Sequence, residues 1–469
     1  MLAQGDKTGG AHSVDAAGGP MDVAPMTAQT RKAKVVCGVD VGGKFTKVRV
    51  EAIDGRSGSS EVSTFKKSDE MPVGERVQGL VGSTFRAIMQ AAKAGNIELR
   101  EIDALGIGAP GARDPETRGF KMPNAIGRDE IGILQEVDFE GSLRQMLERN
   151  GFRKDAVLRG GNDCDVAAAA RKFGRIVVLQ DSRGKLGLMD ETGTAVKVKR
   201  VFLLLGTGIG GGVFMPDGTV DEGATGAMEL GHGGVATTWK SLECGCGKRN
   251  EGSVCIEAVA STTGQENITR ILMQISYASR NMQKEKDVED VFPWDDEARL
   301  LLRKTREWND RKLETEVSGD EAGRLSNSIQ AIDRLLEGSA GAGSLRDVVF
   351  DAGVIDELAV GNPPKVRIAA HAKFVAGQHF GRFLNDSIFP LHNPGELVIG
   401  GGGARTFLNG DEESNPFWRG MMSELRGRKK DPFGAIARCR IIAVVGDENL
   451  GIQGSMEFAR TLYEKGGKP

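Results

Sequence analysis

Val201-Phe-Leu-Leu-Leu-Gly-Thr-Gly-Ile-Gly-Gly-Gly-Val-Phe-Met215 is the stretch that decides the fold. It joins the apolar run Val201 to Leu205 to a second run, Val213 to Met215, through a turn with five glycines in seven residues, Gly206 to Gly212. Short apolar runs around a glycine turn predict two β-strands with a tight connection. Backbone amides of such a turn can approach an anion closely. The alternative is a structural turn in which glycine supplies positive φ.

The same arrangement occurs near the start of the chain. Asp40-Val-Gly-Gly43 lies between the β-rich runs Lys34 to Val41 and Phe45 to Ile53, and a third run follows at Glu61 to Phe65. The Asp40 carboxylate is available to organise a hydrated magnesium ion beside a phosphate, although a plain hairpin turn explains the glycines equally well. Two such units predict a duplicated phosphate-binding α/β fold with two lobes, rather than one Rossmann unit.

The remaining pattern divides the chain into a leader, two lobes and an insertion. Residues 1–33 read as a disordered leader, residues 34–160 as a small lobe joined by a C-terminal helix in 447–469, and residues 161–446 as a large lobe. A charged helical insertion is predicted at about 265–345. The other expected elements are helices Val77 to Ala94, Val166 to Phe173, 366–389 and Gly451 to Lys465, and strands Ala104 to Ile107, one near Ala156 and Glu396 to Ile399.

Bulk composition restricts the class of protein. Acidic residues number 65 and basic residues 62, a net charge of -3, and no sustained basic block offers itself to nucleic-acid phosphates. No apolar run approaches the roughly 20 residues that cross a bilayer, and the first residues lack the order of a secretory signal. The sequence therefore predicts a cytoplasmic protein with no nucleic-acid or membrane partner.

Two further features carry chemistry only in context. Asp163 follows a predicted strand at the start of a helix, where a carboxylate either caps the helix or accepts a proton from a substrate hydroxyl as a general base. The run Gly400 to Gly403 lets backbone lie against a purine or simply packs strand to helix. Spacing alone favours neither reading at either position.

Four potential metal ligands lie within 24 residues: His232, Cys244, Cys246 and Cys255. One imidazole and three thiolates suit a closed tetrahedral zinc site. The spacing differs from a double CxxC finger, and reduced cysteines in a glycine loop need bind nothing. Glu229 and Glu257 bracket this segment as sugar-hydroxyl acceptors or ordinary surface carboxylates. Asn124 either contacts a hydroxyl likewise or shapes a turn.

Taken together, these segments resemble the ROK family of repressors, open reading frames and kinases, which has an actin-like, ribonuclease H-like two-lobed fold. The resemblance covers Val36 to Ser261 and resumes from about Val366 to Ser455, leaving the leader and the insertion unmatched. Its most specific part is Gly223-Ala-Thr-Gly-Ala-Met-Glu-Leu-Gly-His232, followed by Cys244-Gly-Cys-Gly247 and Cys255-Ile-Glu257. The closing segment contains Gly446-Asp447, Gly451 and Gly454.

The resemblance implies a role for each matched residue. Asp163 falls on the catalytic base, and Gly401 and Gly402 fall in the adenosine motif. The two phosphate motifs contain Asp40, Gly42, Gly43, Lys44, Gly206, Thr207 and Gly208. Sugar contacts fall on Asn124, Asn162, Glu229, His232 and Glu257. The zinc ligands fall on His232, Cys244, Cys246 and Cys255, so His232 serves both sites.

Three features depart from the family pattern. Lys44 replaces the usual Thr near the expected γ-phosphate, and the zinc loop is four residues longer before Cys255. The third is the insertion, which covers the cleft, forms a subunit contact or does neither. The expected function is transfer of a phosphoryl group from ATP, with Mg²⁺ and a structural Zn²⁺, to a hexose, most simply glucose, in a homodimer. The alternative is a non-catalytic sugar-binding regulator. Neither the sugar nor the choice of ATP over polyphosphate follows from the sequence.

Overall fold

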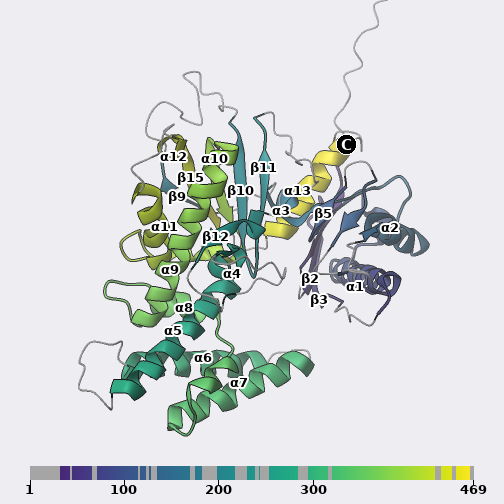
Figure 1. Cartoon of the computed structure of the whole chain (residues 1–469). Coiled ribbons are helices and arrows are strands. Elements are labelled where there is room, and N and C mark those ends of the chain that lie inside the picture. Colours follow the sequence, from purple (N-terminus) through teal and green to yellow (C-terminus); the bar gives the residue numbers. More distant parts are fainter. Residues whose placement is uncertain are drawn as a thin grey trace, which may run out of the picture.

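The computed structural model contains two five-stranded sheets joined through two helices (Figure 1). It describes residues 32–42, 45–65, 71–114, 117–122, 126–127, 135–168, 175–181, 198–216, 230–237, 242, 253–283, 294–314, 319–427, 435–445 and 450–464. Across these ranges no helix is both long and apolar enough to cross a membrane.

The small lobe is built on a sheet with strand order β3-β2-β1-β4-β8. β1 pairs antiparallel with β2 and parallel with β4, and β4 pairs parallel with β8. Helices α1 and α2 cover one face, where valine and leucine side chains of β1 and α1 form a closed core. The elements are β1 (Val35–Val41), β2 (Phe45–Ala52), β3 (Ser57–Ser63), β4 (Ala104–Ala109), β8 (Val157–Asn162), α1 (Val73–Ala94) and α2 (Phe139–Arg149).

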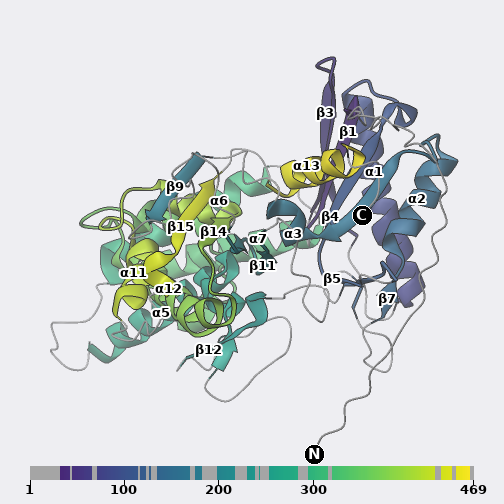
Figure 2. The same cartoon turned by 90° about the horizontal axis from the view of Figure 1, so that it is seen from above.

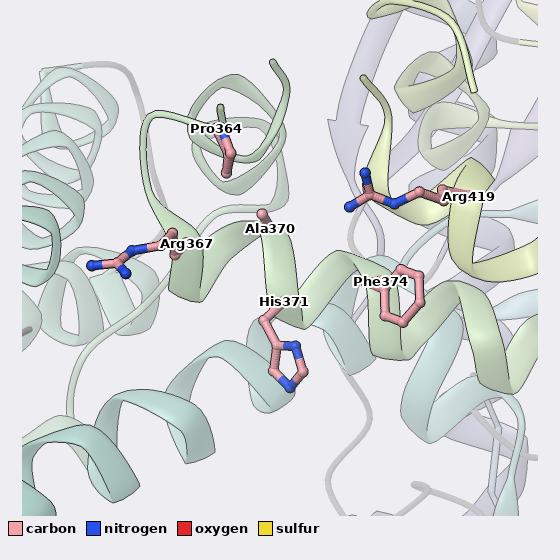
Figure 3. A pocket seen from close by; sticks show the side chains of 6 residues that line it. All are labelled: Pro364, Arg367, Ala370, His371, Phe374 and Arg419. Carbon is pink, nitrogen blue, oxygen red and sulfur yellow. The ribbon is translucent and has the colours of Figure 1, made fainter. Parts of the chain in front are cut away.

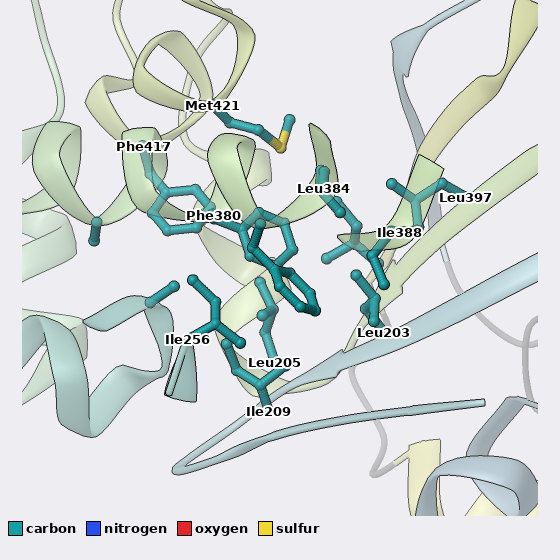
Figure 4. Packing of buried hydrophobic residues seen from close by; sticks show 14 of the residues in the cluster. Leu203, Leu205, Ile209, Ile256, Phe380, Leu384, Ile388, Leu397, Phe417 and Met421 are labelled. Atoms are coloured by element: carbon teal, nitrogen blue, oxygen red, sulfur yellow. The ribbon is translucent and has the colours of Figure 1, made fainter. Parts of the chain in front are cut away.

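The large lobe repeats this plan with strand order β11-β10-β14-β15-β9. β10 pairs antiparallel with β11 and parallel with β14, β14 pairs parallel with β15, and β9 closes the edge antiparallel. Aromatic side chains of α9 and α11 pack onto the β10 hairpin (Figure 4). The elements are β9 (Arg175–Gln180), β10 (Arg200–Leu205), β11 (Ile209–Phe214), β14 (Glu396–Gly400), β15 (Arg440–Val445), α9 (Arg367–Phe383) and α11 (Pro416–Gly427).

The predicted duplication is therefore present, with two corrections. Each lobe has a hairpin with a glycine after its first strand: Gly42 follows β1, and residues 206–208 connect β10 to β11. Gly210, Gly211 and Gly212 were predicted to lie in the turn. They lie instead in β11, paired with β10. A Cβ atom on Gly211 would lie 2.6 Å from the Leu230 side chain and 2.9 Å from the Leu203 side chain, so close packing leaves room only for glycine. The third run also begins earlier than predicted, at Ser57, because its serines pair with β2.

The helical segment is longer than the predicted insertion. It comprises α5 (Thr262–Gln283), a π-helical turn (Trp294–Ala298), α6 (Arg299–Leu313), α7 (Gly319–Glu337) and α8 (Ala352–Ala359). The segment has its own apolar core, which includes leucines of α6 and α7 and Phe350. It attaches to the large lobe where α5 and α8 pack on α9, below the sheets in Figure 1.

Two helices connect the sheets: α3 (Asp163–Ala168), which follows β8, and the C-terminal α13 (Leu450–Glu464). α13 packs on β1 and β4 of the small lobe and crosses α3, and both views place the pair between the lobes (Figures 1 and 2). At the crossing a Cβ atom on Gly454 would lie 2.1 Å from the Val166 carbonyl oxygen. Only glycine allows the two backbones to approach this closely.

We predict that Gly454→Ala lowers the free energy of unfolding by about 2 kcal/mol or more, because the added methyl group must push two helical backbones apart. The matched control is Gly74→Ala in α1, where a Cβ atom meets nothing within 4 Å and the change stabilises a helix by up to about 1 kcal/mol. Urea unfolding of the two variants checks this. Equal stability would show that the crossing is not tightly packed.

Candidate functional site

The first glycine turn is held from behind by two buried hydroxyl groups. Thr64 Oγ1 donates to the Gly42 carbonyl at 2.8 Å and lies 3.0 Å from Thr46 Oγ1. The Gly42 amide donates to the Phe45 carbonyl at 3.0 Å, which closes the turn. The Asp40 side chain therefore projects from the end of a strand whose following turn is fixed.

The start of α13 brings this turn next to the third glycine run. The Asp40 carboxylate carbon lies 2.6 Å from where a Cβ atom of Gly451 would be, so the carboxylate rests on the first turn of the helix. The preceding residue, Leu450, contacts Gly400 at the end of β14. Two consecutive residues of one helix thus contact the first phosphate motif and the predicted adenosine motif.

Asp163 lies at the same edge of the small-lobe sheet. β1, β4 and β8 run parallel, with Asp40 paired to Gly108 and Gly108 to Gly161. Their carboxyl ends meet at one edge, where ligands bind in α/β sheets. Asp163 begins α3 directly after Asn162, and its Cα atom lies 3.4 Å from a Cβ position on Gly108. Sheet register therefore brings Asp40 and Asp163 to one edge with only β4 between their strands.

Asn162, predicted to contact sugar, has a structural bond as well. Its side-chain amide nitrogen donates to the Gly111 carbonyl at 2.9 Å, and the residue is buried. Gly111 has φ of 110°, so this bond fixes a turn that an L side chain rarely adopts. The bond therefore fixes the turn that directly follows β4.

The second glycine turn is braced by α4 (Glu257–Ala260) and α5. Glu257 Oε2 accepts from the Ile209 amide at 3.1 Å. The Thr262 amide and hydroxyl both donate to the Gly206 carbonyl at 2.9 Å. The carboxylate predicted to bind sugar hydroxyls therefore also contacts the turn predicted to bind phosphate.

The third run, Gly400 to Gly403, divides between packing and exposure. Gly401 has φ of 88°, and a Cβ atom there would lie 2.4 Å from the Leu205 carbonyl oxygen. A Cβ atom on Gly402 would meet nothing within 4 Å. Gly401 is thus required by the fold, whereas Gly402 leaves open space beside the second turn. The packing alternative therefore holds for Gly401, and the purine contact stays a prediction for Gly402.

His232 and Cys255 are brought together by a short antiparallel ladder. His232 ends the 3₁₀ turn Leu230–His232, and β12 (Gly234–Ala236) follows at once. β12 pairs with β13 (Ser253–Cys255) so that Gly234 faces Cys255. Cys255 is therefore paired two residues after His232 in the described part of the chain. This register suits the predicted zinc ligand set.

Six predicted site residues lie outside the described ranges: Gly43, Lys44, Asn124, Glu229, Cys244 and Cys246. Within those ranges no group of three or more histidine, cysteine and acidic side chains gathers as a metal site would. Cys244 and Cys246, two of the four predicted zinc ligands, lie outside those ranges.

Sequence reasoning missed the residues that support the turns rather than form them. Thr64 and Thr262 each bind a glycine carbonyl, and the Ser455 hydroxyl donates to the Val39 carbonyl at 2.7 Å. These residues lie 22, 56 and 416 positions from their partners. No local sequence pattern predicts pairs that are this far apart in the chain.

A pocket elsewhere contains none of the predicted residues. It has a volume of about 350 Å³ and lies between α9 and α11 of the large lobe (Figure 3). Arg419 lies over the Phe374 ring at 5.6 Å, while Arg367 bonds to Glu297 at 2.8 Å. Burial lowers the pKa of His371, which lines the same pocket. It is separate from the glycine turns.

One known family matches a segment of the chain. The model of the ROK family matches residues 190–308. The resemblance to the ROK family is thereby confirmed over this segment. The ROK segment contains the second glycine turn, His232, the three cysteines and Glu257, and it continues into α5 and α6, whereas the expected resemblance stopped at Ser261. Among curated proteins, none matches the chain.

Solved ROK structures share the fold. A ROK family glucokinase from Streptomyces griseus, in complex with glucose and AMPPNP, aligns with a TM-score of 0.51 at 20% identity, covering 91% of this chain and 99% of that one. A ROK family transcriptional regulator, a homolog of the E. coli MLC protein, aligns with a TM-score of 0.50 at 14% identity, covering 92% and 78%. The predicted two-lobed actin-like, ribonuclease H-like fold is therefore confirmed.

The two central glycines of the third run give a stability prediction. Gly401→Ala should lower the free energy of unfolding by about 2 kcal/mol or more, since alanine is strained at positive φ and its methyl group meets the Leu205 backbone. Gly402→Ala should stay within about 0.5 kcal/mol of the parent. Thermal unfolding of both variants is the measurement. If the order of stability were reversed, our description of this turn would be wrong.

Proposed function

We propose that the protein is a sugar kinase that transfers the γ-phosphoryl group of ATP to a hexose hydroxyl, with glucose as the first substrate to consider. The observation that carries the proposal is the convergence at the start of α13, where Leu450 contacts Gly400 and Gly451 contacts Asp40. The Streptomyces griseus glucokinase of the same fold, in complex with glucose and AMPPNP, supports both substrate classes.

In this proposal the glycine turns bind the donor. The amides of Gly43 and Gly208, with Lys44 and the Thr207 hydroxyl, bind phosphate oxygens, while the amides of Gly42 and Gly206 donate within their own turns and hold them in shape. The open space at Gly402, next to the packed Gly401, accepts the adenosine. Asp40 would hold a hydrated Mg²⁺ ion, which would supply positive charge for the phosphoryl oxygens.

Asp163 acts as the general base. It accepts the proton of the sugar hydroxyl as that oxygen forms a bond to the γ-phosphorus and the bond to the bridging oxygen of ADP breaks. Asn124, Asn162, Glu229, His232 and Glu257 bind the other sugar hydroxyls. Because Glu257 also bonds to the Ile209 amide, sugar and phosphate sites share one carboxylate, which aligns the two reactants.

The base assignment is tested by Asp163→Asn, which keeps the shape of the side chain but cannot accept a proton. We expect kcat for hexose phosphorylation to fall by about 10²-fold to 10⁴-fold, with the KM for sugar little changed. Asp155→Asn, on an exposed turn of the same lobe, is the control and should keep normal turnover. A folded Asp163→Asn protein with near-parental kcat would remove the assignment.

We further propose a structural zinc ion bound by His232, Cys244, Cys246 and Cys255. When bound, zinc would order the loop between β12 and β13 by joining its two ends. Since His232 and Glu257 flank this ladder, zinc would hold the sugar-binding side chains in position rather than take part in transfer.

Elemental analysis should find about one zinc per chain, as a closed four-ligand site requires. Removing it with a chelator, or substituting Cys255→Ser, should raise the KM for sugar before circular dichroism shows loss of helix. Restoring zinc to the chelated protein should restore the KM. Metal-free protein with unchanged KM and full activity would contradict the zinc proposal.

The second candidate function is a sugar-binding regulator without catalysis. It is favoured by the fold of the ROK transcriptional regulator and by the lysine at position 44, where similar kinases have a hydroxyl. Sugar binding measured by calorimetry, with no turnover for any phosphoryl donor, would support it. The proposal also retains the cytoplasmic location and the division at 34–160 and 161–446 that the sequence pattern predicts, and the homodimer that the resemblance implies.

A further inference from the structure

A cavity lies in the small lobe where β1 begins, at the opposite end of that strand from Asp40. It has a volume of about 650 Å³ and is lined by the residue that precedes β1, by the β2–β3 turn, by the start of β4 and by the end of α13. β1 runs from this cavity at Val35 to Asp40, so at about 3.3 Å per residue the two sites are roughly 17 Å apart. We call it the amino-edge cavity.

Positive charge exceeds negative charge in its lining. Five basic side chains, from Lys32, Lys34, Arg56, Arg100 and Arg153, face three acidic ones, from Asp54, Glu101 and Asp103. The acids are already engaged by arginines. Arg56 bonds to Glu101 at 2.8 Å and to Asp54 at 2.9 Å, and Arg153 bonds to Asp103 at 2.7 Å. Hydrogen bonds from Arg56 lower the pKa of Glu101 to about 2, so that pair stays ionised.

The excess charge lies on Lys32 and Lys34, whose exposed ammonium groups make no ion pair with any residue that the structure describes. The backbone beneath them is fixed, because Asp103 Oδ2 accepts from the amides of Lys34 at 2.6 Å and Val35 at 3.1 Å. Lysine is a point-charge ligand for phosphate.

The lining also has an apolar part. Ile53, at the turn after β2, is 75% exposed, and Tyr463 contributes an aromatic ring from α13. An exposed isoleucine beside unpaired lysines suits an organic phosphate better than a bare anion. The pocket of Figure 3 is a weaker candidate, since Glu297 already engages its Arg367.

We propose that the amino-edge cavity binds a small phosphate ester, with Lys32 and Lys34 on the phosphate and Ile53 and Tyr463 on its organic part. This site is independent of the proposed kinase function. It nevertheless shares two elements with the candidate site, because β1 ends near Asp40 and α13 begins at Gly451.

Calorimetric titration with phenyl phosphate tests the charge assignment. All proteins carry Lys44→Gln, which removes the cation of the proposed donor site. Adding K32Q and K34Q should weaken binding by at least about tenfold, since each lysine contributes a charge-assisted contact. Adding K93Q and K199Q, which remove the same charge outside the cavity, should leave affinity unchanged. Equal binding by the two sets, or no binding by the parent, would overturn the proposal.

The organic part is tested separately with Ile53→Ser, which alters an exposed side chain. Affinity for phenyl phosphate should fall about threefold or more while affinity for inorganic phosphate stays the same. If Ile53→Ser weakened both ligands alike, or neither, the contact of Ile53 with the ligand would be wrong. Rising ionic strength should weaken both ligands, because these lysines are exposed.

Discussion

The crossing of α3 and α13 is the contact on which the rest of the structure depends. Gly454 lets the two backbones approach until a single methyl group would not fit. α3 begins with Asp163, and α13 begins with Leu450 and Gly451 against Gly400 and Asp40. Asp163, the predicted base, is therefore three residues before Val166 at the crossing. Gly451, which contacts Asp40, is three residues before Gly454. A shift of one helix would move the base relative to the phosphate turn, and orientation of that kind dominates reactions between two bound reactants.

In the large lobe the glycine turn is held in position by side chains rather than by a helix crossing. Its glycine turn at 206–208 is held by the Glu257 carboxylate and by Thr262, both of which follow the β12–β13 ladder. In that ladder Cys255 pairs with Gly234, which is two residues after His232. Segments assigned to sugar, phosphate and metal are thus connected by consecutive contacts. His232 and Glu257 lie on either side of the ladder that contains Cys255.

Local pattern was sufficient for the two hairpins, because alternating apolar runs and glycine turns depend on neighbours in sequence. It failed where packing decides. Gly210 to Gly212 look like a loop but form a strand, since β10 lies opposite and Leu230 leaves no room. β9 and β15 were not predicted, although β15 is an apolar run, Arg440–Val445. The convergence of Asp40, Gly400 and Asp163 was implied only by family resemblance. The contacts that produce it, such as Ser455 with Val39, join opposite ends of the chain.

The most direct measurement is a panel assay of the unmodified protein, in which several hexoses and N-acetylated amino sugars are each combined with ATP and with polyphosphate labelled in the transferable phosphoryl group. The account predicts labelled sugar phosphate from at least one sugar with ATP, with glucose among the substrates, and one ADP released per sugar phosphorylated. Sugar binding without labelled product from any pair would contradict it.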